Sequence, residues 1–221
     1  MMSGKRWGYV VQFFCLLVFF GMSPFLIKMD GRKTMSVSSD SVRSQNVSDE
    51  VKPVVALTFD DGPNASSTPI LLDGLRERKV RATFFLIGEN VEKDENEKIV
   101  KRMYEEGHLI GNHTYTHCNL SKLETGEAKK ELEQTDTVIE KITGKQPVFV
   151  RAPYGELPVD SEQDLNRIYI GWTVDPLDWM TEDTGAVVKT VVEEINPGDV
   201  ILLHDCYPSS CLLYTSDAAD E

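Results

Sequence analysis

The feature that most constrains this chain is an alternation of apolar, β-branched segments with amphipathic segments of helical period, beginning near residue 53. Strand-like segments cover residues 54–59, 81–88, 108–113, 148–152, 170–175 and 200–204. Helix-like segments cover residues 66–79, 92–106, 125–143 and 184–195. Such alternation is typical of a parallel sheet with helices outside it. The six segments of strand character therefore predict an α/β fold, a distorted (β/α) barrel with parallel strands.

Polar motifs follow the carboxyl ends of most of these expected strands. They are TFDDGP at 58–63, HTYTH at 113–117, RAPYG at 151–155, DPLDW at 175–179 and ILLHD at 201–205. The carboxyl ends of parallel strands meet at one edge of the sheet, where α/β proteins build their sites. We therefore expect these motifs to lie together in one site.

Three of these side chains are suited to hold a metal ion. His113 and His117 have the HxxxH spacing, which lets two imidazoles converge, and adjacent carboxylates at Asp60 and Asp61 are costly without a cation. One Asp with two His makes a three-ligand site with open positions. Surface or core histidines, and an ordinary turn at the acidic pair, remain the alternatives. We assign no role to His108.

The remaining motifs supply acid–base chemistry. Asp60 could deprotonate water that the metal activates, and Arg151 could keep Asp60 ionised. His204 is placed to act as a general acid, with Asp175 raising its pKa, and Trp179 is suited to stack on a sugar. An ordinary surface ion pair for Arg151, a capped strand-end histidine and a core indole remain the alternatives.

The five motifs together resemble the polysaccharide deacetylases, the NodB-homology carbohydrate esterases of family four, over about residues 54–210. The resemblance implies a distorted (β/α) barrel and hydrolysis of N-acetyl groups on N-acetylglucosamine polymers. By motif, the resemblance implies that Asp60 is the base, that Arg151 orients it, and that the metal triad is Asp61, His113 and His117. It places Pro153 and Tyr154 at the oxyanion site, through the backbone N–H of Tyr154, and Trp179 in the wall of the substrate groove. It makes His204 the acid, tuned by Asp175 or Asp178.

The expected cofactor is one divalent metal ion, zinc by preference, with cobalt or another divalent ion as alternatives. The expected partner is an acetylated amino-sugar polymer, peptidoglycan above all, with chitin oligomers and acetylxylan as alternatives. An iron(II) oxygenase and a sugar-binding module without turnover are further hypotheses that the motifs leave open. The oligomeric state is not predicted.

The ends of the chain differ from the domain. Lys5 and Arg6 precede an apolar run over 7–27, so residues 1–30 are expected to be a membrane anchor rather than a cleaved signal, followed by a flexible linker over 31–52. The deacetylase domain is expected over 53–210, incomplete at its end, and 211–221 as a non-native tail. We expect an extracytoplasmic protein at the cell wall. The net charge of −13 argues against a nucleic acid partner.

Two of the four cysteines, Cys118 and Cys206, sit beside polar motifs. A disulfide between them and two free thiols are both compatible with an extracytoplasmic protein.

Overall fold

The computed structural model describes residues 54–93, 95–159 and 166–206. The predicted anchor, linker and non-native tail lie outside the described residues. Within the described ranges, no helix is long and apolar enough to cross a membrane.

A six-stranded parallel sheet forms the centre of the fold, in the order β5-β4-β3-β2-β1-β6. Its strands are β1 (Ala56–Asp60), β2 (Thr83–Leu86), β3 (Leu109–Asn112), β4 (Phe149–Val150), β5 (Ile168–Tyr169) and β6 (Val200–His204). Every pairing is parallel, as the alternation of segments predicts. The register places Asp60 opposite His204, so the last residues of β1 and β6 are neighbours.

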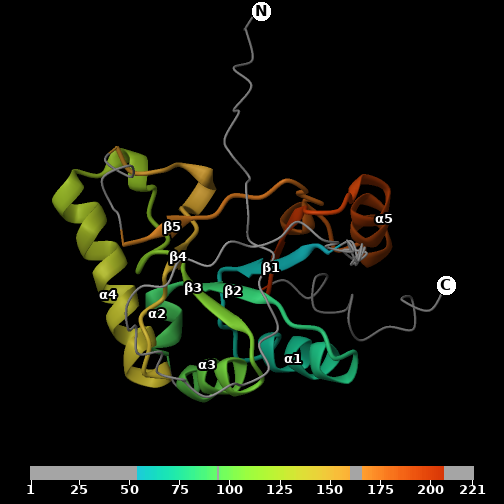
Figure 1. The fold of residues 1–221 in the computed structure, drawn as a ribbon, viewed down its shortest axis with the longest axis horizontal. Helices are drawn as coiled ribbons and strands as arrows, with labels where there is room; N and C mark the ends of the chain where they lie inside the picture. Colours follow the sequence, from blue (N-terminus) through green and yellow to red (C-terminus); the bar gives the residue numbers. More distant parts are fainter. Residues whose placement is uncertain (1–53, 94, 160–165, 207–221) are drawn as a thin grey trace, which may run out of the picture. The chain divides into compact units, whose positions relative to one another are not determined.

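Helices connect the strands and lie outside the sheet (Figure 1). They are α1 (Thr68–Glu77), α2 (Gly88–Val91), α3 (Asn96–Glu105), α4 (Thr125–Thr143) and α5 (Thr184–Glu194). The predicted range for α4 agrees at both ends, and α1, α3 and α5 fall within their predicted ranges. The four-residue α2 was not predicted, because it is too short to show a helical period.

The predicted strand over residues 170–175 is wrong in its detail. Strand β5 pairs with β4, and the N–H of Ile170 donates to the carbonyl of Val150. After Ile170 the chain leaves β4. Three residues later, Thr173 and then Val174 donate to the carbonyl of Val200, and Val174 forms a parallel bridge with Ile201. Because β4 and β6 lie at opposite sides of the sheet, one short segment cannot pair with both along its length. This broken strand closes the ring and distorts the barrel.

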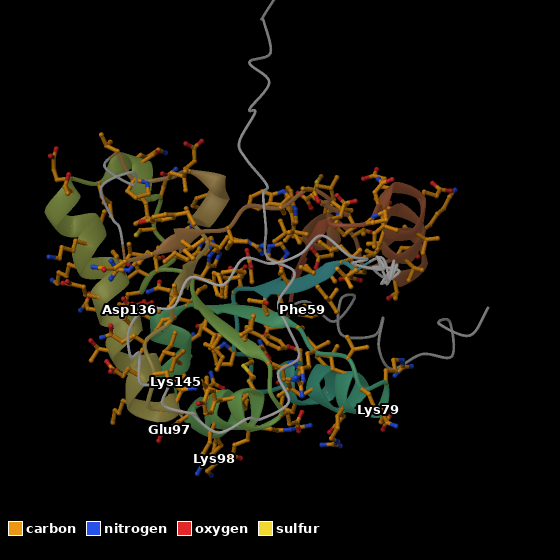
Figure 2. The ribbon with its side chains drawn as sticks, viewed as in Figure 1. Phe59, Lys79, Glu97, Lys98, Asp136 and Lys145 are labelled. Carbon is orange, nitrogen blue, oxygen red and sulfur yellow. The ribbon has the colours of Figure 1, made fainter. Side chains whose placement is uncertain are left out.

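The core lies between the sheet and the helices. Phe59 and Phe84, on neighbouring strands, are fully buried and stack with ring centroids 5.3 Å apart. Figure 2 shows Phe59 within the interior, whereas Lys79 and Lys98 lie at the periphery. Strands β1, β2 and β6 each contain three consecutive buried residues, so both of their faces are covered, which is why they read as nearly continuous apolar runs. That core fixes the strand ends from which the polar motifs emerge.

Candidate active site

The polar motifs converge on the carboxyl edge of the sheet, as expected. Asp60 is the last residue of β1 and His204 the last of β6, whereas His113 directly follows β3 and Arg151 directly follows β4. Asp61 has a φ of 73°, a left-handed conformation that is costly for a residue with a Cβ. The amide of Asn90 donates to the carbonyl of Asp61 at 2.7 Å and so holds this turn.

The predicted metal ligands lie together. One ligand atom from each of Asp61, His113 and His117 falls within 4.8 Å of the other two. Oδ1 of Asp61 is 3.4 Å from Nε2 of His113 and 3.2 Å from Nε2 of His117. These three residues come from two loops, and the sheet brings the loops side by side.

The chemistry of this donor set fits a cation. Nδ1 of His113 lies 2.7 Å from the carbonyl oxygen of Arg151, which can only accept, so Nδ1 carries the proton and a neutral ring presents the lone pair of Nε2 to Asp61. Oδ1 of Asp61 is buried, and no well-formed hydrogen bond reaches it from the described residues. Lone pairs facing one another are stabilised by a shared metal ion, and a carboxylate with two imidazoles suits zinc and similar ions.

Charges within the triad shift its pKa values. Without a metal ion, burial favours the neutral acid of Asp61, but an imidazolium at His113, whose Nε2 is 3.4 Å from Oδ1, and the charge of His117 outweigh burial, so the pKa of Asp61 is lowered. Burial disfavours the imidazolium of His113, yet Asp60 and Asp61 together raise its pKa. At His117 burial prevails over the attraction of Asp61, and the pKa is lowered. Asp60 and Asp61 thus favour positive charge at this edge, which a bound cation can supply while the ring of His113 stays neutral.

Asp60, the predicted base, lies in a buried ion pair. Its Oδ1 accepts from Nη1 of Arg151 at 2.8 Å, and its Oδ2 is 3.7 Å from Nε2 of His113. Arg151 is only 1% exposed, and it also donates to Thr58 Oγ1 and to the carbonyls of Ile170 and Gly171. Arg151 is therefore not the surface ion pair of the alternative reading. Its hydrogen bonds join the end of β4 to β1 and to the segment that closes the barrel.

His204 has an acidic partner, but this partner is Asp178 rather than Asp175. Nδ1 of His204 lies 2.8 Å from Oδ1 of Asp178, and its backbone N–H donates to Oδ2 of the same carboxylate at 2.7 Å. Burial acts to lower the pKa of His204, and the hydrogen bond and charge of Asp178 raise it overall. Oδ1 of Asp175 accepts from the N–H of Leu177, in the turn that carries the chain to the short helix Asp178–Met180. The turn reverses the chain, so the later carboxylate of the motif faces His204.

Of the two predicted aromatic or oxyanion residues, Tyr154 contacts a triad residue, and Trp179 directly follows Asp178 in the chain. The ring of Tyr154 lies 5.0 Å from the ring of His117, and the side chain is 66% exposed. Tyr154 follows the buried Pro153 and has a φ of 62°. Trp179 is 48% exposed, so it is not a core residue. Exposed aromatic faces beside buried charges provide a surface on which sugar rings can stack.

Sequence reasoning gave no role to some residues that shape the site. Asp205 is fully buried against Gly62, where a Cβ would lie 2.1 Å from its Oδ2, so only glycine fits there. Burial raises the pKa of Asp205 to about 7, although the Thr68 hydroxyl that donates to it acts in the opposite direction. Cys118 and Cys206 are free thiols. The pairing of Asp205 with the DDGP turn joins two motifs far apart in sequence, which no local pattern could indicate.

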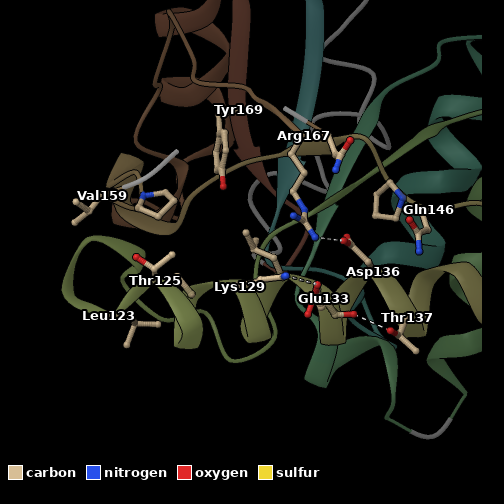
Figure 3. A pocket seen from close by; sticks show the side chains of 15 residues that line it. Leu123, Thr125, Lys129, Glu133, Asp136, Thr137, Gln146, Val159, Arg167 and Tyr169 are labelled. Atoms are coloured by element: carbon tan, nitrogen blue, oxygen red, sulfur yellow. Dashed lines mark hydrogen bonds and ion pairs between the residues drawn. The ribbon is translucent and has the colours of Figure 1, made fainter. Parts of the chain in front are cut away.

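A cavity of about 730 Å³ lies away from the triad, between α4 and the start of β5 (Figure 3). Its charged residues pair with one another: Arg167 with Asp136 at 2.6 Å and Lys129 with Glu133 at 3.6 Å. The chemistry-bearing motifs do not line this cavity, so we place the candidate active site at the triad.

The parallel sheet thus carries a buried acid–arginine pair, a histidine–acid pair and a candidate metal triad at one edge. The chain belongs to the polysaccharide deacetylase family, which matches residues 48–170. A peptidoglycan-N-acetylglucosamine deacetylase of Bacillus cereus is 42% identical over 173 residues, covering 77% of this chain and 62% of that protein. The chain therefore spans about three fifths of that relative's length.

Two further relatives bear on the site. The solved structure of peptidoglycan deacetylase PdaC from Bacillus subtilis matches with a TM-score of 0.71 and 37% identity, covering 75% of this chain and 81% of that one. A chitooligosaccharide deacetylase from Bradyrhizobium sp. is 39% identical over 160 residues, covering 70% of this chain and 71% of the relative. These likenesses confirm the predicted family and the predicted fold class.

Proposed function

We propose that this chain is a metal-dependent hydrolase that removes N-acetyl groups from N-acetylglucosamine units of peptidoglycan. The observation that carries the proposal is the convergence of Asp61, His113 and His117 within 4.8 Å, next to a buried Asp60. The relatives named for peptidoglycan deacetylation support the substrate, since they share both the family and the fold.

In the proposed reaction, Asp61, His113 and His117 hold one divalent ion, zinc by preference. When bound, this ion supplies Lewis-acid activation of water and of the acetyl carbonyl. Asp60 accepts the proton that water loses as its oxygen attacks the carbonyl carbon. Arg151 donates to Asp60 at 2.8 Å and orients this carboxylate.

The second half of the proposed reaction breaks the carbon–nitrogen bond. The backbone N–H of Tyr154 stabilises the negative charge that develops on the carbonyl oxygen. His204 in its protonated form donates a proton to the leaving nitrogen, and Asp178 favours that form by raising the pKa of the ring. The products are acetate and a free amino sugar. Trp179 stacks on the sugar at the edge of the site.

The proposed location is outside the cytoplasm. We propose that residues 1–30 anchor the chain, that residues 31–52 form a linker, and that the catalytic domain begins near residue 53. The support is the apolar run over residues 7–27 with Lys5 and Arg6 before it. An anchored domain would reach the cell wall, where peptidoglycan lies.

The second candidate function is deacetylation of chitin oligomers, favoured by the chitooligosaccharide deacetylase among the relatives. The same catalytic residues would serve both substrates, so only the sugar-binding surface would differ. Acetylxylan is a third substrate that the same chemistry would hydrolyse.

The test is acetate release by the full chain, purified in detergent, on peptidoglycan, chitin oligomers and acetylxylan. We expect release from peptidoglycan above all, loss on chelation, and recovery with zinc or cobalt but not with buffer. Asp60→Asn is the control, which should bind metal and release no acetate. Faster release from chitin oligomers would favour the second function. Glycan binding without release from any substrate would contradict catalysis and support a binding module.

A further inference from the structure

The loop that carries both histidine ligands, residues 113–117 (the histidine loop), is strained. Thr114 has a φ of 64° and His117 a φ of 57°, in the left-handed region that residues with a Cβ avoid. A β-branched residue such as Thr114 is particularly disfavoured there. Such a conformation persists only where surrounding contacts determine it. The contacts of the histidine loop are therefore part of the metal site.

Short helix α2 holds the loop from one side. The backbone N–H groups of Gly88 and Glu89 donate to the carbonyls of Thr114 and Tyr115, each at 3.0 Å. Gly88 lies so close to the loop that a Cβ there would be 2.4 Å from Cδ2 of Tyr115. These bonds involve the carbonyl groups of the loop and leave its N–H groups to other partners.

Helix α4 holds the loop from the other side through Glu131. A single carboxylate oxygen, Oε2, accepts from the backbone N–H of Tyr115 at 3.0 Å, the backbone N–H of Thr116 at 2.9 Å and the hydroxyl of Thr116 at 3.1 Å. Asn112 accepts from the N–H of Thr114 at 2.8 Å and donates to the carbonyl of Leu132 in α4. Glu131 thus joins α4 directly to the middle of the loop.

The two histidine ligands depend on this loop to different degrees. His113 is fixed independently, because its N–H donates to Leu86 and its ring bonds to the carbonyl of Arg151. Within the described residues, the ring of His117 has no comparable hydrogen bond; its Nε2 lies 3.2 Å from Oδ1 of Asp61, and the ring packs edge-on against the rings of His113 and Tyr154. Its direction therefore depends on the backbone that leads to it, which Glu131 holds at Tyr115 and Thr116.

We propose that Glu131 is a positioning residue that aims His117 at the metal, an inference that rests on the proposed function. Its charged oxygen organises three donors of a strained loop, and charged acceptors form stronger hydrogen bonds than neutral ones. Helix α4 packs against the rest of the fold through buried apolar residues such as Leu132 and Ile139, rather than through Glu131. Loss of the Glu131 carboxylate therefore loosens the histidine loop while the helix stays packed.

The test is titration of the metal-free full chain with cobalt(II), followed by the visible absorption of the bound ion, which reports ligand geometry. In Glu131→Ala we expect cobalt affinity to fall about 10–100-fold, the usual effect of losing a group that orients a metal ligand, with an altered spectrum. Glu131→Gln keeps an acceptor oxygen, so its affinity and spectrum should lie closer to those of the wild type.

The matched control is Glu133→Gln, two residues along the same helix, where the carboxylate is exposed and lies 3.6 Å from Nζ of Lys129. It should leave the affinity and the spectrum unchanged. Thermal unfolding of each metal-free variant separates loss of positioning from loss of folding. If Glu131→Ala does not fold, Glu131→Gln carries the test through a smaller change in affinity and spectrum.

Unchanged cobalt affinity and spectrum in folded Glu131 variants would overturn the positioning role, as would an equal loss in Glu133→Gln. The outcomes for the wild type separate this inference from the proposed function. Wild type that binds cobalt but releases no acetate contradicts the function alone, and the Glu131 comparison still decides the positioning role. Wild type that binds no cobalt overturns both.

Discussion

Strand β3 carries a histidine at each end, and the two behave in opposite ways. His108 precedes the strand and His113 follows it, and both are buried, at 5% and 3% exposure. Burial lowers the pKa of His108, whose ring accepts the N–H of Ala82 at 3.1 Å and packs edge-on against Phe84. Burial acts in the same direction at His113, but Asp60 and Asp61 outweigh it and raise the pKa.

This difference teaches that burial of a histidine does not by itself define a site. At the amino end of β3 the nearest acid to His108 is Glu106, whose Oε2 is 3.9 Å away and which pairs with Arg102 instead. At the carboxyl end, two carboxylates at the end of β1, those of Asp60 and Asp61, both lie near Nε2 of His113. The direction shared by parallel strands concentrates acids and imidazoles at one edge, where they can hold a cation and move protons.

The largest expected effect comes from exchanging these two histidines for alanine one at a time. His113→Ala should abolish cobalt binding and acetate release together, because the triad retains only two ligands. His108→Ala should keep both, with a modest loss of stability. Cobalt titration and an acetate assay on both variants measure this. Full activity of His113→Ala after chelation would remove the metal from our account of the site.

The next largest effect concerns a buried arginine, Arg151, and a partly exposed one, Arg102. Arg151→Met leaves the buried carboxylate of Asp60 without its partner, so we expect the free energy of unfolding to fall by about 3–5 kcal/mol. Arg102→Met removes partly exposed pairs with Asp73 and Glu106, and we expect about 0–1 kcal/mol. Urea unfolding of the two variants gives both values. Equal losses of unfolding free energy in the two variants would contradict the contrast between the buried and the exposed ion pairs.

A smaller effect is expected at His204, through its partner. Asp178→Asn removes the charge that raises the pKa of His204, so the protonated acid is lost at lower pH. The alkaline limb of the pH profile of kcat/KM should therefore move to lower pH. The rate should fall by less than the about 10²–10⁴-fold that a general acid contributes in full. Asp175→Asn is the matched control, and an equal shift there would restore Asp175 as the partner.

The smallest effect is the pH dependence that His108 gives to stability. Its pKa is lowered from 6.5 in the folded chain, so the unfolded chain takes up the proton first as the pH falls. The stability that neutral His108 provides is full above pH 6.5 and is lost as the pH falls through 6.5 towards the folded pKa.

His108→Gln can still accept the N–H of Ala82 but does not titrate in this range. We expect the variant to be less stable by about 1 kcal/mol or less near neutral pH, with the difference from wild type narrowing in acid. Urea unfolding at about pH 8 and about pH 5.5 measures the difference on either side of the transition. A difference that widens in acid would show that His108 is protonated in the folded chain.

Much of the fold could be predicted from residue patterns, because helical periodicity and apolar strand segments are local features of the sequence. The period over residues 125–143 gives α4 at both ends, and the run before Asp60 gives β1. The pattern failed over residues 170–175, where the segment pairs first with β4 and then with β6. Which strand a segment pairs with depends on residues distant in sequence, so no local pattern could divide it.

The residue types and their spacing are enough to predict the kinds of group at the site: two adjacent acids, an HxxxH pair, an arginine and a strand-end histidine. Residue type and spacing fix what a side chain can donate, accept or ligate. The partners emerge from the folded structure, namely Asp178 for His204, Glu131 for the histidine loop and Asp205 against Gly62. Pairing depends on distances of a few ångströms between segments up to 143 residues apart, and packing of the whole barrel sets those distances.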